Sequence, residues 1–440
     1  MLDINFLPVP EQKIIDEKFT KIKPLMTASE AVVESSRCLF CYDAPCINAC
    51  PTSIDIPMFI RQIMTKDTTG AAKTIFTQNI LGKSCGQVCP TSVLCEGACV
   101  YHDLNEKPID IGRLQAYATE HAIDNNIRLF KKGESTDKKV AIIGAGPAGL
   151  ACAHELTVLG HEVIIFEANK KAGGLNIYGV APYKFSNEDV NQEIKYISEI
   201  GFKIKTNSPV KNVSKLEKEF DAIFLGTGLG SSKEINISGE NLKGVYGATE
   251  FIHNLRAKEL KVSVGKDVVV IGGGNTAIDA AVESSLLGAN ATIIYRRTED
   301  EQSAYTFEIE HAKKQNVKFI YLTSPVEILG KENVTGLRCI KNKLKKSEII
   351  PQKGSEFVIP CNMVIKARGQ EKMIDFFNSI PKIKLNNGKV MVNKNFQTAN
   401  PKYFAGGDCI NGGKEVVNAV ADGRDAARGI DKFLMKHKRK

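Results

Sequence analysis

The chain has 440 residues, a formal net charge of +9 and 43% hydrophobic residues, so it is long enough for two or three globular domains. It has no apolar stretch long enough to cross a bilayer, and its first residues lack the basic and apolar regions of a secretory signal, which predicts a cytoplasmic protein without a membrane partner. Basic residues cluster only in the terminal run 436–440 and elsewhere alternate with acids, so nucleic acid is not an expected partner.

The first region along the chain, residues 1–131, is rich in cysteine and has helical patterns, for example at residues 56–64 with Pro57 in the first turn. Eight of the twelve cysteines lie between Cys38 and Cys99. Clustered cysteines in an intracellular chain favour metal or redox chemistry over disulfides. The other four are single and are predicted to be small apolar core residues: Cys152, Cys339, Cys361 and Cys409.

The clustered cysteines form two groups. The first has the spacing C-x2-C-x4-C-x3-C-P and consists of Cys38, Cys41, Cys46 and Cys50. This spacing is similar to the ferredoxin run, in which three thiolates hold one iron–sulfur cluster and the cysteine before proline holds a second. The second group consists of Cys85, Cys89, Cys95 and Cys99. Thiolate sulfur suits iron–sulfur clusters, and zinc bound by four thiolates is the structural alternative.

A polar stretch, residues 131–137, is predicted to link this region to an α/β region that starts at Lys139. There, short Val- and Ile-rich strands alternate with helical segments, which is the pattern of a parallel sheet. The pattern starts twice with a glycine-rich turn, near 144 and near 272. The predicted fold class is therefore α/β, with an N-terminal helical domain followed by two Rossmann-like nucleotide-binding domains.

The first glycine-rich turn follows the predicted strand 140–143 and precedes a helical segment. Gly144 permits the tight turn, Gly146 lets the backbone approach a pyrophosphate, and Gly149 lets the helix pack closely on the strand. The phosphates would lie at a helix N-terminus, which favours negative charge. The next strand ends at Glu167, where a ribose-binding carboxylate is expected. The predicted dinucleotide-binding residues here are Gly144, Gly146, Pro147, Ala148, Gly149 and Glu167.

The second glycine-rich turn follows the predicted strand 268–271 and has alanine at the third position of the motif. Its next strand ends in Arg296 and Arg297 rather than in an acid. Two guanidiniums suit a 2′-phosphate, so NADPH is favoured over NADH, and solvated strand-end charges are the alternative. The predicted residues are Gly272, Gly274, Asn275, Thr276, Ala277, Arg296 and Arg297. Two nucleotide sites favour iron–sulfur clusters over zinc, because a redox-inert ion has no evident task beside redox cofactors.

Three segments of the cysteine region closely resemble the N-terminal half of dihydropyrimidine dehydrogenase: residues 37–52, 85–91 and 109–115. The match is to the iron–sulfur/FAD subunit of the bacterial two-subunit form, and the resemblance covers essentially the whole chain. The small subunit of glutamate synthase is a relative with the same architecture.

The resemblance implies two 4Fe-4S clusters. One would be held by Cys38, Cys41, Cys46 and Cys99, and the other by Cys50, Cys89, Cys95 and Gln115. Cys85 would be left unligated, although its spacing alone does not decide this. An oxygen of Gln115 in place of a thiolate changes the charge of the cluster and so its reduction potential. Gln115 favours the dihydropyrimidine dehydrogenase branch, because glutamate synthase relatives tend to carry an acid there, and an ordinary helix-surface amide is the alternative.

The resemblance also implies that FAD binds at the first turn and that a later segment completes its site. The helix after Glu415 would face the isoalloxazine ring. The implied flavin-side residues are Gly173, Gly174, Leu175, Gly407 and Asp408. The FAD domain would be discontinuous, with the NAD(P)H domain inserted at strand-end turns near 226–228 and 367–369. The expected domains are 1–131 with the clusters, 132–244 and 371–440 with FAD, and 245–370 with NAD(P)H.

The function implied by the resemblance is an NAD(P)H-oxidising FAD/iron–sulfur oxidoreductase subunit without a catalytic side chain, since the cofactors perform the chemistry. The chain ends soon after the FAD domain and lacks the FMN-containing barrel that reduces uracil and thymine in the fused enzymes. We therefore expect an FMN-containing dihydropyrimidine dehydrogenase catalytic subunit as partner. The alternatives are the large subunit of glutamate synthase, exchange of electrons with ferredoxin, and a non-catalytic assembly role that the intact glycines disfavour.

Overall fold

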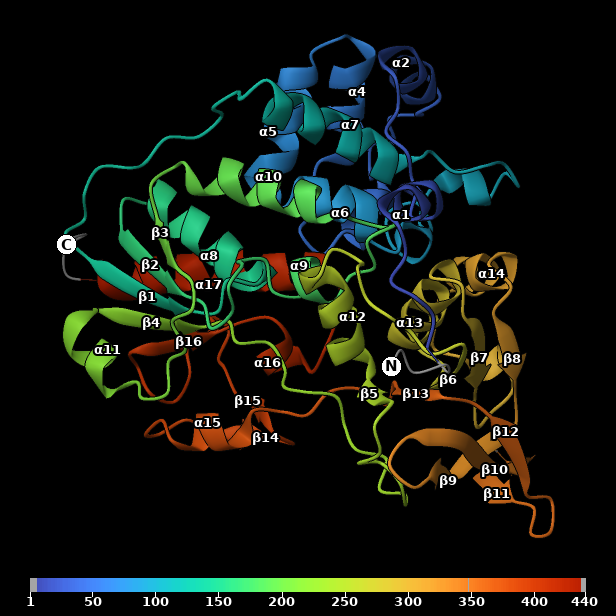
Figure 1. The fold of residues 1–440 in the computed structure, drawn as a ribbon. Helices are drawn as coiled ribbons and strands as arrows, with labels where there is room; N and C mark the ends of the chain where they lie inside the picture. Colours follow the sequence, from blue (N-terminus) through green and yellow to red (C-terminus); the bar gives the residue numbers. More distant parts are fainter. Residues whose placement is uncertain (1–5, 347, 437–440) are drawn as a thin grey trace. The chain divides into compact units, whose positions relative to one another are not determined.

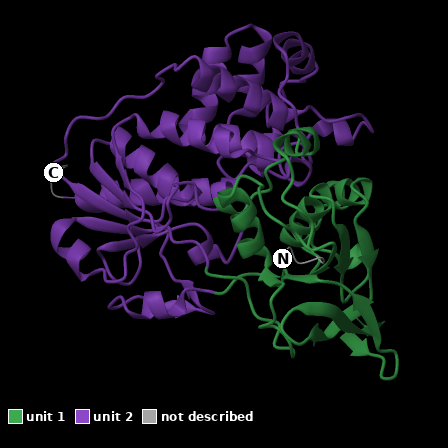
Figure 2. Ribbon diagram, in the orientation of Figure 1, with its two compact units in different colours: residues 1–20, 178–183, 230–371 green, residues 21–177, 184–229, 372–440 purple. Residues whose placement is uncertain are grey.

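The computed structural model describes residues 6–346 and 348–436. Residues 1–5, considered above for a secretory signal, and residues 437–440 of the basic run lie outside the described residues. The chain divides into two compact units, coloured separately in Figure 2. Unit 1 contains residues 1–20, 178–183 and 230–371, and unit 2 contains residues 21–177, 184–229 and 372–440. Within the described part of the chain, no helix has the length and hydropathy needed to span a membrane.

The cysteine-rich region folds as the helical part of unit 2. Its elements are α2 (Ala28–Ser36), α3 (Pro45–Ala49), α4 (Ile56–Met64), α5 (Thr68–Gln78), α6 (Gly82–Val88), η1 (Thr91–Val93), η2 (Val100–His102) and α7 (Ile111–Asp124). The predicted helix with Pro57 in its first turn is α4, and the Asp55 side chain caps it by accepting from the Met58 N–H at 3.1 Å. One face of α4 is buried, including Phe59 and Ile60, which contribute to an apolar core shared with α5 and α7.

A five-stranded parallel sheet forms the rest of unit 2, in the order β16-β4-β1-β2-β3. Its strands are β1 (Lys139–Ile143), β2 (Glu162–Phe166), β3 (Lys203–Lys205), β4 (Ala222–Leu225) and β16 (Tyr403–Ala405). The helices α8 (Pro147–Val158) and α17 (Val416–Leu434) pack on each other and on one face of the sheet (Figure 1). The smaller elements are α9 (Leu175–Tyr178), α10 (Asn187–Ser198), α11 (Ser214–Glu219), α15 (Ile374–Asn378), β14 (Leu385–Asn386), β15 (Lys389–Val390) and α16 (Asp408–Asn411).

Unit 1 contains a second parallel sheet, in the order β5-β13-β6-β7-β8. Its strands are β5 (Val245–Gly247), β6 (Asp267–Ile271), β7 (Asn290–Ile294), β8 (Lys318–Ile320) and β13 (Met363–Lys366). Its helices are α1 (Gln12–Lys18), α12 (Ala248–Ala257), α13 (Asn275–Leu286), η3 (Glu299–Glu301) and α14 (Thr306–Lys314). A separate antiparallel sheet, absent from the sequence-based prediction, contains β9 (Thr323–Gly330), β10 (Val334–Lys345), β11 (Glu348–Pro351) and β12 (Phe357–Pro360).

The chain connectivity confirms that one nucleotide-binding fold is inserted in the other. Strand β16, from the C-terminal segment, pairs in parallel with β4, so the first sheet is built from both sides of the insertion. The two connecting segments at the edge of unit 1 pair with each other: the Gly230 N–H donates to Glu371 O at 2.8 Å and the Lys233 N–H to Gly369 O at 2.9 Å. Both predicted strand-end turns stand where expected, directly after β4 and directly after β13.

Candidate cofactor sites

Four thiols surround one apolar cavity in the helical part of unit 2: Cys38, Cys41, Cys46 and Cys99. Burial and the neighbouring thiols of Cys38 and Cys99 raise the pKa of Cys46 to about 12. Crowded, buried thiols ionise only when a bound cationic group offsets the charge of the thiolates, as iron does. Among the described residues, no three Cys, His, Asp or Glu side chains converge closely enough to hold a single metal ion. The four thiols line a shared cavity, and thiolates are the donors that an iron–sulfur cluster uses.

The remaining clustered cysteines form a second group in the same helical part. Burial, then the charges of Glu96, Cys89 and Cys50, raise the pKa of Cys95. Cys85 and Cys89 are buried together with Val417, at the start of α17, and Cys50 packs against them. The main cause of the raised pKa of Cys89 is a hydrogen bond in which the Cys89 thiol donates to Cys85, and burial is the next cause. Cys85 thus lies within the second group, although the resemblance leaves it unligated.

Gln115 lies in the interior rather than on a helix surface. Its side chain is 7% exposed, and its amide nitrogen donates to Gly82 O at 2.7 Å. This bond uses the nitrogen and leaves Oε1 as the atom available to another partner. Gln115 projects from the face of α7 that packs on α6, where an added Cβ at Gly86 would stand 2.8 Å from Gly112 O. Gln115 therefore belongs beside the helix that contains Cys85 and ends before Cys89.

The first glycine-rich turn has room for a phosphate. Gly146 is the extended N-cap of α8, and an added Cβ there would meet only Gly174 Cα, at 3.8 Å. Gly174 has φ +55°, and its own added Cβ would lie 2.7 Å from Gly146 Cα, so a larger residue would push the two loops apart. The open space lies at the helix N-terminus that starts with Pro147 and Ala148. This arrangement fits a dinucleotide pyrophosphate.

Glu167, at the end of β2, is buried and braces the first turn. One carboxylate oxygen accepts from the Ala145 N–H at 2.9 Å, and the other accepts from the Asn169 N–H at 2.8 Å and from its side-chain amide at 3.0 Å. Each oxygen of an ionised carboxylate has two lone pairs, so a ribose hydroxyl can still donate to Glu167. The structure therefore fits both a positioning and a binding role for this residue.

The C-terminal segment approaches the first turn through Gly407, where an added Cβ would stand 3.0 Å from Ala148 Cβ. The Gly407 N–H donates to Asp422 at 3.0 Å, and Asp408 accepts from the Lys414 N–H at 3.2 Å. Burial raises the pKa of both carboxyls. Sequence reasoning missed Asp422, because nothing local distinguishes it from the other polar residues of α17. The predicted FAD residues thus come together, with Leu175 at the start of α9 and 40% exposed.

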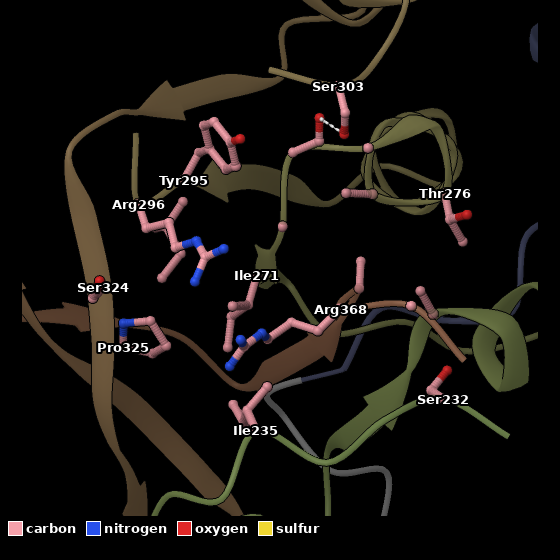
Figure 3. A pocket seen from close by; sticks show the side chains of 18 of the residues that line it. Ser232, Ile235, Ile271, Thr276, Tyr295, Arg296, Ser303, Ser324, Pro325 and Arg368 are labelled. Carbon is pink, nitrogen blue, oxygen red and sulfur yellow. Dashed lines mark hydrogen bonds between the residues drawn. The ribbon is translucent and has the colours of Figure 1, made fainter. Parts of the chain in front are cut away.

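Unit 1 contains a cavity of about 600 Å³ at the carboxyl ends of β6, β7 and β13 (Figure 3). Five predicted residues line it: Gly272, Gly274, Thr276, Ala277 and Arg296. The other two predicted residues, Asn275 and Arg297, do not line the cavity. Asn275 accepts from the Tyr305 N–H at 3.0 Å and so holds the loop before α14. Arg297 directly follows Arg296 in the bend after β7 and is half-buried, whereas Arg296 is exposed.

The same cavity is lined by Arg368, which sequence reasoning treated only as part of a strand-end turn. The strand before it, β13, is the neighbour of β6. Ligands of parallel sheets bind where the carboxyl ends of adjacent strands meet, so the position after β13 was a usable signal once the strand order was known.

Two protein-family models match the chain. Residues 15–127 match the family described as dihydropyrimidine dehydrogenase domain II, 4Fe-4S cluster, and residues 138–423 match the pyridine nucleotide-disulphide oxidoreductase family. Among curated proteins, the PreT subunit of the NAD-dependent dihydropyrimidine dehydrogenase of Escherichia coli K12 is 34% identical over 97% of this chain and 98% of that protein. The small chain of the NADPH glutamate synthase of the same organism is 31% identical over 98% of each chain.

Among solved structures, Mycobacterium tuberculosis FprA in complex with NADPH matches with a TM-score of 0.57 and 20% identity, over 68% of this chain and 85% of that one. The thioredoxin reductase of T. acidophilum matches with a TM-score of 0.54 and 24% identity, over 67% of this chain and 98% of that one. These structures share the fold of the nucleotide-binding part.

Proposed function

We propose a role for this chain from the premise that it belongs to the pyridine nucleotide-disulphide oxidoreductase family, in the group of iron–sulfur flavoproteins that includes the dihydropyrimidine dehydrogenase subunit PreT. It is an NAD(P)H dehydrogenase that uses FAD and 4Fe-4S clusters. Its proposed task is to take electrons from NAD(P)H and deliver them, through two clusters, to a partner subunit that reduces uracil and thymine.

When bound, NAD(P)H supplies a hydride, FAD accepts its two electrons, and the clusters pass electrons one at a time. The chain's own residues hold these groups in place. The glycine turns before α8 and α13 offer backbone N–H groups to pyrophosphates. In this proposal Cys38, Cys41, Cys46 and Cys99 hold one cluster, and Cys50, Cys89, Cys95 and Gln115 hold the other. Each reduced pyrimidine takes up two electrons and two protons, which balances one NAD(P)H and one proton from water.

The proposed order of electron transfer is from NAD(P)H to FAD and then to the clusters. The observation that best supports it is the packing of the second cysteine group against α17. Val417, in the first turn of α17, is buried with Cys85 and Cys89. Farther along the same helix, an added Cβ at Gly423 would stand 2.1 Å from Ala148 O, so α17 touches the first turn of α8. One helix thus contacts both the second cysteine group and the proposed FAD site within one compact unit, which favours a short path between them.

The proposed partner is an FMN-containing dihydropyrimidine dehydrogenase catalytic subunit. The similarity to the PreT subunit over nearly the whole of both chains supports it. The similarity to the glutamate synthase small chain supports a second candidate, a glutamate synthase large subunit. The interior position of Gln115, a neutral amide, favours the first candidate, because the glutamate synthase relatives tend to have an acid there.

The test is to purify the chain without oxygen and to assay it with each partner. We expect about eight iron and eight sulfide per FAD, and bleaching of the yellow-brown colour on addition of NAD(P)H. Mixing with an FMN-containing pyrimidine-binding subunit should give NAD(P)H-dependent conversion of uracil to dihydrouracil. Zinc in place of iron, or glutamate formation with an amidotransferase subunit instead, would reject the proposal.

The assignment of the cluster ligands is tested by two neighbouring cysteines, Cys85 in α6 and Cys89 directly after it. Cys89→Ser should lose about half of the iron, because it removes a proposed ligand of one of two clusters. Cys85→Ala is the matched control and should keep all the iron. Loss of iron from both variants would show that the second cluster is held differently.

A further inference from the structure

Two arginines from different strands share the cavity of unit 1. Arg296 follows β7 and Arg368 follows β13, and these strands lie on either side of β6. Figure 3 shows both guanidinium groups directed into the same hollow. Among the residues that the structure describes, neither arginine has a carboxylate partner, and none of the residues lining the cavity is acidic. Two like charges that share a cavity repel each other, and a bound anion relieves the repulsion.

Both arginines are attached to anchored backbone. Arg296 O accepts from the side-chain amide of Asn342 at 3.0 Å, and Asn342 is buried. After Arg368, Gly369 O accepts from the Lys233 N–H at 2.9 Å, and the next side chain, Gln370, donates to Gly230 O at 2.9 Å. Fixed attachment points keep both exposed side chains within reach of the same cavity.

We propose that Arg368 is a second ligand of the 2′-phosphate of NADPH, and that it binds this group together with Arg296 while Arg297 takes no part. This inference rests on the proposed dinucleotide role of the cavity. A phosphate monoester has a charge near −2 at neutral pH, and guanidinium forks bind its oxygens in pairs. Two guanidiniums facing one hollow match that charge. The result is a site selective for NADPH over NADH, although the PreT relatives are named NAD-dependent.

The competing position for Arg368 is the pyrophosphate, which NADPH and NADH share. The adenosine half of the cofactor separates the two possibilities. The ligand 2′,5′-ADP contains the 2′-phosphate but no pyrophosphate, and 5′-AMP lacks the 2′-phosphate. Binding of both is measured by calorimetry on the full cofactor-loaded chain, in the wild type and in Arg368→Ala, Arg296→Ala and Arg297→Ala.

We expect Arg296→Ala and Arg368→Ala each to weaken binding of 2′,5′-ADP by roughly ten- to a hundredfold, and binding of 5′-AMP by less than about threefold. Arg368→Lys keeps the charge but not the fork and should fall between the wild type and Arg368→Ala. Arg297→Ala is the matched control, because it removes the same charge one residue along. The ratio of the affinity for 2′,5′-ADP to the affinity for 5′-AMP should be the same in Arg297→Ala as in the wild type.

Several outcomes would overturn the inference. An unchanged affinity of Arg368→Ala for 2′,5′-ADP would exclude contact with the 2′-phosphate. Equal weakening of the binding of both ligands would place Arg368 beside the 5′-phosphate. If Arg297→Ala lost as much affinity for 2′,5′-ADP as Arg368→Ala, the 2′-phosphate would be assigned to the adjacent pair, Arg296 and Arg297, as well. Binding of neither ligand by the wild type would reject the dinucleotide role of the cavity itself, a failure distinct from the others.

Discussion

The two nucleotide-binding folds of this chain start with the same arrangement of strand, glycine turn and helix. In each, a five-residue strand leads through a glycine turn into a twelve-residue helix and then to a second five-residue strand. The helix N-caps, Gly146 and Gly274, both have extended backbone, with ψ of −179° and 174°. The two sheets have corresponding strand orders, β16-β4-β1-β2-β3 and β5-β13-β6-β7-β8.

The two folds differ in the charge after the second strand, which is Glu167 in the first and Arg296 in the second. Backbone N–H groups at a helix N-terminus bind phosphate in either case, so the repeated part recognises what the two cofactors share. The strand-end side chain meets the ribose, where the cofactors differ. We therefore expect the duplicated turn to bind the phosphates, and the charged side chains beside it, Arg296 and Arg368 in the second fold, to give selectivity.

The surroundings of the two turns differ as well. The first turn belongs to the unit that also contains the cysteine helices, and buried polar groups connect the two parts. Lys83 of α6, 1% exposed, contacts Glu120 of α7 at 2.7 Å and Asp189 of α10 at 3.2 Å. The Ser84 N–H donates to Glu193 of α10 at 2.9 Å. The second turn opens instead on a cavity with exposed arginines. The first turn thus belongs to a unit with buried polar contacts between its parts, whereas the second turn lines an accessible cavity.

The largest expected effect comes from removing the buried cation that joins the cysteine helices to the FAD fold. Lys83→Met leaves Glu120 and Asp189 without their buried partner and should cost about 3–5 kcal/mol of unfolding free energy. The matched control is Lys21→Met, because Lys21 contacts the same Asp189 at 2.8 Å but is 32% exposed, and its loss should cost at most about 1 kcal/mol. Thermal unfolding of the loaded protein measures both. Equal and small losses of unfolding free energy in the two variants would show that the contacts of Lys83 do not hold the cysteine helices and the FAD fold together.

A second prediction concerns the third position of the glycine motif, where the two turns differ. An added Cβ at Gly149 would lie 2.0 Å from Gly144 O, which is backbone and cannot move aside. Gly149→Ala should therefore cost about 3 kcal/mol and reduce the FAD content. Ala277→Gly at the matching position of the second turn should cost only about 1 kcal/mol, the helix propensity of alanine. Absorbance of bound flavin and the unfolding midpoint test this. Full FAD content in Gly149→Ala would contradict the close packing.

The parts of the fold that could be predicted are those with a local signal. Val- and Ile-rich runs before the glycine turns predicted β1 and β6, and both strands extend one residue farther at their N-terminal ends than expected. The antiparallel sheet was missed, because the alternation of buried and exposed residues along β10 is interrupted in several places, which weakens the local signal for a strand. The resemblance supplied the insertion of one fold in the other, which residue patterns alone did not.

The site residues that could not be predicted depend on contacts between distant segments. Arg368 becomes a neighbour of Arg296 only because β13 and β7 flank β6, an order that the sequence does not encode locally. Asp422 and Gly407 meet through the fold of α17 against the last strand. Ser84 and Glu193 are 109 residues apart and have no common motif. The ligand roles of the cysteines and of Gln115 stay predictions.

The smallest expected effect is a dependence of stability on pH that comes from Glu193. This carboxyl is 1% exposed and accepts from the Ser84 N–H and hydroxyl. Burial outweighs these bonds and the charge of Lys83 and raises the pKa of Glu193 from 4.5 to about 7. Between these values the folded protein retains a proton that the unfolded chain has released. Its stability therefore falls as the pH rises from about 4.5 to 7.

Glu193→Gln removes this loss, because an amide stays neutral. Relative to the wild type, the variant should gain about 2.5 kcal/mol between pH 5 and pH 8, which is less than the full shift corresponds to, because part of the wild-type loss occurs below pH 5. Unfolding midpoints of both proteins at unit steps of pH measure the gain. The matched control is Glu188→Gln, an exposed carboxyl on the same helix. A difference between Glu193→Gln and the wild type that stays constant from pH 5 to pH 8 would mean that Glu193 is ionised in the folded protein. The joint between the cysteine helices and the FAD fold would then consist of charged pairs throughout, rather than of one charged group beside one protonated acid.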